Sequence, residues 1–346
     1  MAAPWNYGVM TTPALPIVDI SKFHGTDDQR EEFLAELRDA AHNVGFFYVI
    51  GHGVPESVTT GVMDAAHEFF ALPLEDRLEI DNLKSPQFRG YTRVGYEHTN
   101  GHPDRRDQLD VGVEREVLDL GPDAPAYWGL IGPNQWPSAM PELKPAVLAW
   151  QAEAYRVSRD VLTALGVALG QPETYFDEWF DATSHSHLKV VRYPGRGDAP
   201  DEQGVGAHKD YGFLALVLQD ELGGLKVEAK NGEWLDATPI PGAFVFNIGE
   251  LLEIASRGYL RATVHRVTSP PGDVERYSVP FFLGPRLDTV MPQLVLPPEL
   301  EAEASGMDDD PNNPLLANFG NNTLKGWLRA HPKVTEIYWQ DVPVPS

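Results

Sequence analysis

The chain has 346 residues, a net charge of −24 and no cysteine. A surface this acidic repels phosphate groups, so neither nucleic acid nor an anionic membrane is an expected partner. The lack of cysteine excludes disulfides, thiolate metal sites and iron–sulfur clusters. The sequence contains no run of 18 apolar residues, and residues 1–12 lack the pattern of a signal peptide. We therefore expect a cytoplasmic protein.

The first half of the sequence predicts helices. Apolar residues recur at helical spacing over Asp27–Asn43 and Glu142–Leu169, and Ser57 is the expected N-cap of a helix that ends at Ala71. The apolar run Phe46–Ile50 predicts a buried strand between the first two helices. Residues 81–140 are rich in glycine, proline and charge, and we interpret them as long loops.

After Gly170, short β-like runs follow one another closely, and Asn231-Gly232 between two of them predicts a hairpin. Residues 308–322 have the composition of a loop, and Thr323–Ala330 predicts a final helix. The predicted strands of this half are His187–Tyr193, Phe213–Gln219, Leu225–Ala229, Trp234–Thr238, Ala243–Ile248, Thr263–Thr268 and Tyr277–Leu283.

With Phe46–Ile50 these runs make eight strands, which suits a jelly roll of two sheets. We expect an α+β protein with a mainly β core. A mainly helical region over residues 1–170, including a long supporting helix, would pack on a jelly-roll core over residues 171–346. The two parts would form one integrated globular unit.

A pattern of metal-binding residue types stands at His208-Lys209-Asp210. On an extended segment, residues two apart point to the same face, so the imidazole and the carboxylate can reach one ion. His265 lies in a predicted apolar strand, where a histidine is unusual. Two histidines and one carboxylate form the facial triad of non-haem Fe(II) oxygenases, which leaves positions open for a chelating acid and O2.

A second pair of polar residues begins the last predicted strand. Arg276 and Ser278 share a face by the same alternation, directly before the apolar run Val279–Leu283. A buried arginine needs an anionic partner, and its guanidinium binds a carboxylate in a bidentate manner. The pair therefore predicts a site for an acid, but it does not identify which acid.

These motifs lie in an order that resembles the isopenicillin N synthase-like branch of the Fe(II)/2-oxoglutarate-dependent dioxygenases. The likeness covers nearly the whole chain. It runs through Leu15–Asp19, Gly45–Pro55, Leu72–Leu74, Arg192–Pro194, Gly206–Gly212, Gly223–Leu225, Asn247–Gly249, His265–Val267 and Arg276–Ser278.

The resemblance implies a double-stranded β-helix, or distorted jelly roll, with Fe(II) held by the catalytic residues His208, Asp210 and His265. It implies 2-oxoglutarate as co-substrate, bound by Arg276 and Ser278 with help from Tyr193. With O2, a small organic substrate would be hydroxylated, desaturated or cyclised while 2-oxoglutarate yields succinate and CO2.

We also expect Arg192 to face the co-substrate, on the condition that the strand bends or bulges next to Pro194. Strict alternation would instead send Arg192 away from Tyr193, toward an acidic partner outside the site. The candidate substrate pocket, by position in the fold, consists of Tyr91, Arg93, Tyr96, Phe213, Phe282 and Phe319.

Three alternatives remain open at the level of the sequence. In isopenicillin N synthase itself, the matching arginine and serine hold the substrate and no keto acid is used. The aminocyclopropane carboxylate oxidases rely on ascorbate. A metal-binding jelly roll without catalytic activity would also retain the triad. The oligomeric state and the primary substrate cannot be read from the residues.

Overall fold

The computed structural model describes residues 15–198, 203–306 and 314–343. Its largest element is an eight-stranded sheet in the order β1-β2-β12-β9-β14-β7-β6-β3. The strands of this sheet are β1 (Ile17–Asp19), β2 (Phe46–Ile50), β3 (Gly90–Thr92), β6 (Asp107–Gly112), β7 (His187–Tyr193), β9 (Leu214–Gln219), β12 (Phe244–Ile248) and β14 (Arg276–Leu283).

A second sheet of four strands has the order β11-β10-β13-β8. Its strands are β8 (Gln203–His208), β10 (Leu225–Glu228), β11 (Trp234–Asp236) and β13 (His265–Thr268). The hairpin between β10 and β11 contains Asn231-Gly232, as predicted. A separate small hairpin pairs β4 (His98–Thr99) with β5 (His102–Pro103) and contacts β8.

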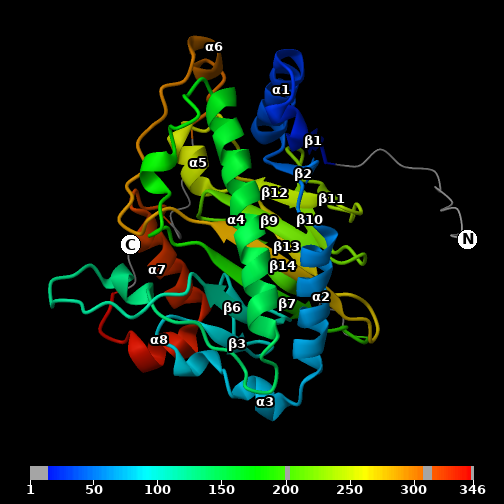
Figure 1. The fold of residues 1–346 in the computed structure, drawn as a ribbon. Helices are drawn as coiled ribbons and strands as arrows, with labels where there is room; N and C mark the ends of the chain where they lie inside the picture. The colour runs from blue at the N-terminus through cyan, green and yellow to red at the C-terminus, as the bar shows by residue number, and fades with distance from the viewer. Residues whose placement is uncertain (1–14, 199–202, 307–313, 344–346) are drawn as a thin grey trace, which may run out of the picture.

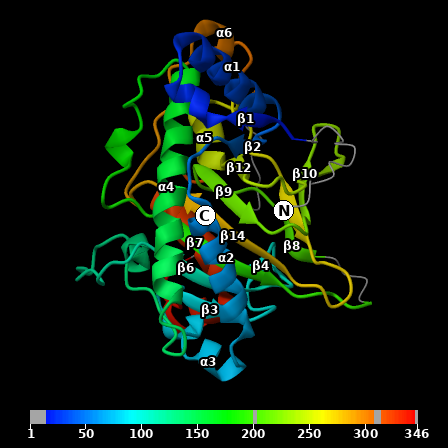
Figure 2. The same ribbon diagram turned by 45° about the vertical axis from the view of Figure 1, so that its right-hand side comes forward.

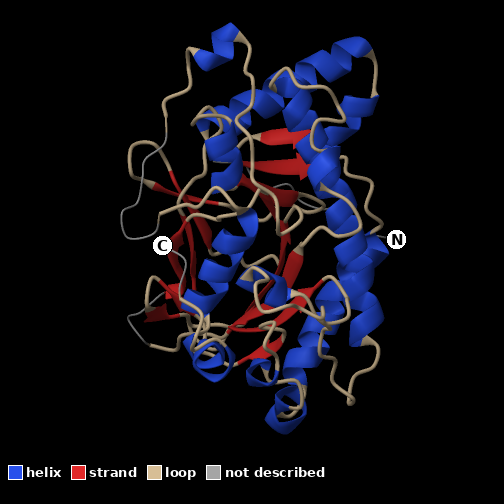
Figure 3. Cartoon of the chain, turned by 90° about the vertical axis from the view of Figure 1, so that its left-hand side faces the viewer, coloured by secondary structure: helices blue, strands red, loops and turns tan. Residues whose placement is uncertain are grey.

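Helices cover the outer face of the large sheet. The long helix α4 (Leu143–Ala168) runs across this sheet beside α2 (Glu56–Ala71), and α1 (Asp27–Asn43) packs against the far end of α4 (Figures 1 and 2). Figure 3 shows helices along the right-hand side of the strands, and loops outside the strands on the left. The remaining helices are α3 (Leu74–Leu78), α5 (Glu250–Ala255), α6 (Pro298–Glu301), α7 (Phe319–Ala330) and α8 (Pro332–Tyr338).

Alternation along the strands divides the apolar residues between two cores. In β2, Phe47 and Val49 belong to the core that the helices share, whereas Phe46 and Tyr48 belong to a smaller core that also includes residues of β8, β10 and β13. The protein is thus a mixed α+β protein with a sheet-dominated core. The polar residues of the candidate site lie on the side of the large sheet that faces this smaller core.

Several sequence-based expectations need correction. Residues 81–140 are not only loops, because they contain β3 to β6. Helix α2 begins at Glu56 after Pro55 and has no side-chain cap, so the N-cap assigned to Ser57 was wrong. Helix α7 begins at Phe319, where the side chain of Asn318 accepts a hydrogen bond from the Asn321 N–H. Of the predicted loop 308–322, residues 308–313 lie outside the described residues.

Among the helices of the described residues, none has the length and apolar character needed to cross a membrane.

The junction between β12 and α5 predicts a steric requirement. A Cβ atom on Gly249 would lie 2.2 Å from the carbonyl oxygen of Gly212, in the segment that follows Asp210. We expect Gly249→Ala to lower the free energy of unfolding by about 1–3 kcal/mol, the usual cost of overpacking, as measured by denaturant unfolding. As a control, Gly61 in α2 has open space around it, and Gly61→Ala should be neutral or stabilise by up to ~1 kcal/mol. Equal effects of the two substitutions would contradict this account.

Candidate active site

The register between two neighbouring strands brings three potential metal ligands together. His208 ends β8 and His265 begins β13, and the two residues are paired in the antiparallel ladder. Asp210 follows two residues after His208. One ligand atom from each of the three side chains lies within 4.8 Å of the other two. The closest contacts are His208 Nε2 to Asp210 Oδ1 at 3.5 Å and His265 Nε2 to Asp210 Oδ2 at 3.8 Å.

Hydrogen bonds to the backbone fix which nitrogen of each imidazole faces the Asp210 carboxylate. His208 Nδ1 lies 2.8 Å from the Gly206 carbonyl, and His265 Nδ1 lies 3.1 Å from the Thr263 carbonyl. Because a carbonyl oxygen can only accept, each Nδ1 carries a hydrogen, and each Nε2 is the nitrogen that faces Asp210. The Asn247 amide donates to Asp210 Oδ2 at 2.7 Å and holds the carboxylate in place. This is the supporting shell that metal-binding residues need.

The charge states of Asp210 and His265 suit a cation. Burial alone would raise the pKa of Asp210, but the two imidazoles hold it well below its usual range. Burial, together with the neighbouring His208, lowers the pKa of His265 to about 4. Burial also opposes protonation of His208, yet its hydrogen bond and attraction to Asp210 raise its pKa. At neutral pH the site therefore offers a carboxylate and a neutral His265, which are the forms that ligate metals.

The predicted acid-binding pair lies on β14, with Arg276 beside Tyr193 of β7 in the ladder. Arg276 is 1% exposed, and its guanidinium lies 4.8 Å above the Tyr193 ring. The guanidinium donates to the Gly223 carbonyl, to Ser278 Oγ at 3.4 Å and to Gln219 Oε1 at 3.2 Å. All three acceptors are uncharged. Within the described ranges no carboxylate lies within 4.0 Å of Arg276, so its charge is buried without a counter-ion.

The expectation for Arg192 was wrong. Its guanidinium donates to both carboxylate oxygens of Asp107, at 2.9 and 2.8 Å, and pairs with Glu275 at 3.1 Å. It also lies 5.3 Å from the centre of the Phe70 ring of α2. The strand does not bend as that expectation required, and strict alternation places Arg192 on the helix side of the sheet, opposite Tyr193.

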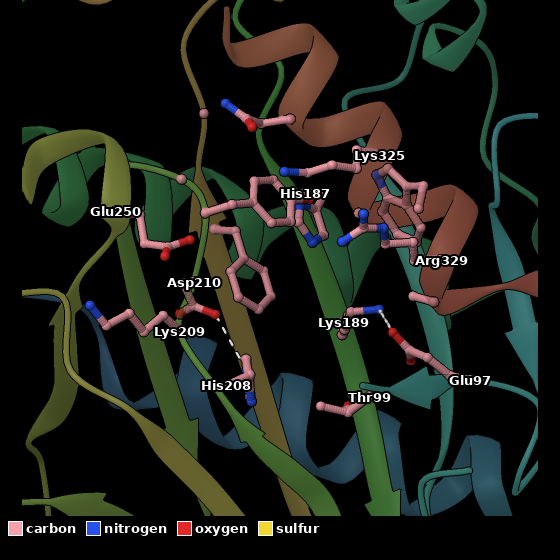
Figure 4. A pocket seen from close by; sticks show the side chains of 18 of the residues that line it. Glu97, Thr99, His187, Lys189, His208, Lys209, Asp210, Glu250, Lys325 and Arg329 are labelled. Atoms are coloured by element: carbon pink, nitrogen blue, oxygen red, sulfur yellow. Dashed lines mark hydrogen bonds and ion pairs between the residues drawn. The ribbon is translucent and has the colours of Figure 1, made fainter. Parts of the chain in front are cut away.

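A cavity of about 750 Å³ adjoins the three potential ligands. Figure 4 shows its walls, with His208, Asp210 and Glu250 on one side and Lys325 and Arg329 of α7 on the other. Burial raises the pKa of the Glu250 carboxyl to about 7, and repulsion from Glu253 and Asp210 adds to the shift.

Two of the six predicted pocket residues, Phe282 and Phe319, line this cavity. The other four are engaged elsewhere. Tyr91 donates to Asp107, Arg93 pairs with Asp81, Tyr96 lies under Lys333, and Phe213 packs in the core against Phe180.

Sequence reasoning also missed several polar residues of the walls. They come from segments whose sequence pattern gives little indication of a site: the β4 region, the residue before β6, the first half of β7, and helices α5 and α7. The missed residues are Glu97, Thr99, Arg106, His187, Lys189, Glu250, Asn322, Lys325 and Arg329.

Comparison with known proteins agrees with the geometry. A model of the 2OG-Fe(II) oxygenase superfamily matches residues 184–285, and a model of the non-haem dioxygenase in morphine synthesis N-terminal family matches residues 15–139. The chain therefore belongs to the 2OG-Fe(II) oxygenase superfamily, as the resemblance implied.

Relatives with similar lengths support the assignment. The 2-oxoglutarate-dependent dioxygenase frbJ of Dothideomycetidae sp. is 33% identical and covers 96% of this chain and 94% of the relative. A homoarginine-6-hydroxylase of Arabidopsis thaliana is 34% identical over 81% of this chain and 87% of the relative. The crystal structure of a full-length Neurospora crassa protein in complex with alpha-KG and thymine has a TM-score of 0.71 and 27% identity, covering 85% and 92% of the two chains. The protein is thus an oxidoreductase, an oxygenase that depends on Fe(II), 2-oxoglutarate and O2.

The ion pair of Arg192 gives a testable prediction. Arg192→Ala should lower the free energy of unfolding by about 1.5–3 kcal/mol, the range for hydrogen bonds to a charged group, because Asp107 keeps only Arg77 and Tyr91. The affinity for 2-oxoglutarate, titrated anaerobically with Fe(II) present, should not change. Lys144→Ala, which removes an exposed pair with Glu114, should cost less than ~1 kcal/mol. A selective loss of 2-oxoglutarate affinity in Arg192→Ala would restore the original expectation.

Proposed function

We propose that His208, Asp210 and His265 are the catalytic ligands of a single Fe(II). The proposal is supported by two Nε2 atoms and one carboxylate that converge on a common point, with both Nδ1 hydrogens committed to backbone carbonyls. Two imidazoles and a carboxylate are the donor set of non-haem Fe(II) oxygenases. Asn247 would act as a positioning residue for Asp210.

The far carboxylate of 2-oxoglutarate would bind to Arg276 and Ser278, with Tyr193 beside it. The observation that carries this proposal is the buried guanidinium of Arg276, which lacks a carboxylate partner among the described residues. An uncompensated buried charge costs several kcal/mol, and a bidentate carboxylate would remove this cost. The requirement for 2-oxoglutarate separates this proposal from keto-acid-independent chemistry of the isopenicillin N synthase type.

When bound, Fe(II) with 2-oxoglutarate and O2 would supply the oxidising chemistry, with succinate and CO2 as the co-products. The residues of the chain would orient the co-substrate and place the substrate in the cavity. We infer a small organic substrate, and hydroxylation, desaturation or ring closure as the outcome. One named relative is a homoarginine-6-hydroxylase, whose named compound is cationic, and one similar structure contains thymine, which is neutral. The charge of −24 supports the exclusion of nucleic acid.

We infer further that the two sheets form a double-stranded β-helix. The helical region over residues 1–170 and the core over residues 171–346 would be one integrated unit. This is supported by the contacts of α2 and α4 with β14 and by the pairing of β2, β3 and β6 into the same sheet as β7 and β12.

The metal assignment predicts the effect of removing one ligand. In His265→Ala, metal analysis after dialysis should find Fe(II) occupancy near zero, because losing a direct ligand costs more than the ~10–100-fold loss of affinity typical of supporting residues. Succinate release should fall in parallel, while circular dichroism stays that of the folded protein. His24→Ala, at an exposed position, is the matched control. Full iron occupancy in His265→Ala would remove His265 from the ligand set.

The co-substrate assignment predicts a second effect. Arg276→Ala should weaken 2-oxoglutarate binding to the Fe(II) protein by at least ~100-fold, measured by anaerobic calorimetry. Arg266→Ala serves as the control, because the Arg266 guanidinium lies over the Trp234 ring rather than in the site. An unchanged affinity in Arg276→Ala, or substrate oxidation by the wild type without any keto acid, would refute the assignment.

A further inference from the structure

A carboxylate of the cavity wall lacks a partner. Glu250 opens α5, and its backbone N–H donates to the Asp210 carbonyl at 2.8 Å, which fixes the residue next to the proposed iron ligands. Its side chain lines the cavity and is directed into it in Figure 4. Across the described ranges, no hydrogen bond to this carboxylate is found and no cationic nitrogen lies within 4.0 Å of it.

The other acidic groups near the cavity are compensated. Glu97 pairs with Lys189 at 3.2 Å and with Arg106 at 3.1 Å. Glu253, on the same helix as Glu250, pairs with Lys209 at 3.1 Å. Asp210 is committed to the two imidazoles. Glu250 is therefore the carboxylate of this wall that remains available to a positively charged ligand group.

The opposite wall has a different chemical character. Lys325 and Arg329 of α7 line it, and Lys325 Nζ donates to the Pro314 carbonyl. His187, which Figure 4 shows between the two walls, stacks against the ring of Phe282, which also lines the cavity, with the centroids 4.4 Å apart. A ligand with a cationic end, an apolar middle and an acidic or polar end would match this sequence of surfaces. The charge of −24 also attracts cations at long range.

We propose that the substrate is a small molecule of the basic amino acid class, whose guanidinium or ammonium group pairs with Glu250 while its acidic end faces Lys325 and Arg329. The inference rests on the proposed function, because it takes the cavity next to the iron ligands as the substrate site. Lys209 and Lys325 attract the Glu250 carboxylate only from beyond 4.0 Å, so an uncharged ligand would leave this partly buried group without an ion-pair partner.

Anaerobic calorimetry on the protein loaded with Fe(II) and 2-oxoglutarate tests the proposal without turnover. The probes are L-arginine and L-homoarginine, with L-citrulline as the uncharged near-isostere of arginine. We expect at least one cationic probe to bind, and citrulline to bind at least ~10-fold more weakly than arginine. Glu250→Gln should weaken the cationic probe by at least ~10-fold and leave citrulline unchanged, whereas Glu250→Asp should retain part of the preference for the cation.

Glu299→Gln, at an exposed position of α6, is the matched control and should change nothing. Circular dichroism and an unchanged affinity for 2-oxoglutarate show that a variant is intact. The proposal is overturned if neither cationic probe binds the wild type, if citrulline binds equally well, or if the loss occurs in Glu97→Gln and not in Glu250→Gln. Failure of the proposed function would differ from all of these, because the wild type would then not bind 2-oxoglutarate at all.

Discussion

The antiparallel pairing of β8 with β13 is the constraint on which the proposed site depends. His208 and His265 are partners in the ladder, so their rings lie on one face of the small sheet with centroids 4.3 Å apart. A slip of one residue in this ladder would turn one imidazole to the other face. Gly249 also contributes to this arrangement. Because glycine has no Cβ atom, the segment after Asp210 can approach the end of β12 closely.

Electrostatics then distinguishes the supporting charges from the available ones. Lys189, for example, is buried between Glu97 and Asp110 and forms an ion pair with each of them. The charge of Lys189 is therefore compensated within the protein. Arg276 and Glu250 have no counter-ion among the described residues. Arg276 is a buried cation beside Tyr193, and Glu250 is a carboxylate on the cavity wall. Arg276 would therefore bind the acidic co-substrate, and Glu250 would bind the cationic end of the substrate.

Much of the fold could be predicted from the apolar pattern. The strands β2 and β7 and helix α1 have the predicted bounds. Phe46–Ile50 is a continuous apolar run, and Asp27–Asn43 has apolar residues at helical spacing. Strand β8 was missed, since Gln203–His208 contains two glycines and little apolar surface. Strand β6 was missed because its buried Asp107 and Asp110 read as loop residues, and only the folded chain supplies Arg77, Arg192 and Lys189 as partners.

The candidate ligands and Arg276 could be recognised because their spacing of two residues carries chemical meaning on a strand. The cavity walls could not, because Glu97, Glu250 and Lys325 come from distant segments that only tertiary packing brings together. Arg192 shows the reverse error. The alternation of β7 already indicated that it points away from Tyr193, and the structure follows that simple rule.

A crystal structure of the protein grown anaerobically with Fe(II) and 2-oxoglutarate would test the metal and co-substrate assignments together. We expect one metal ion bonded to Nε2 of His208, Nε2 of His265 and the Asp210 carboxylate. We also expect the far carboxylate of 2-oxoglutarate to lie on Arg276 and Ser278. A metal bound elsewhere, or a co-substrate carboxylate that leaves Arg276 without an anionic partner, would contradict these assignments.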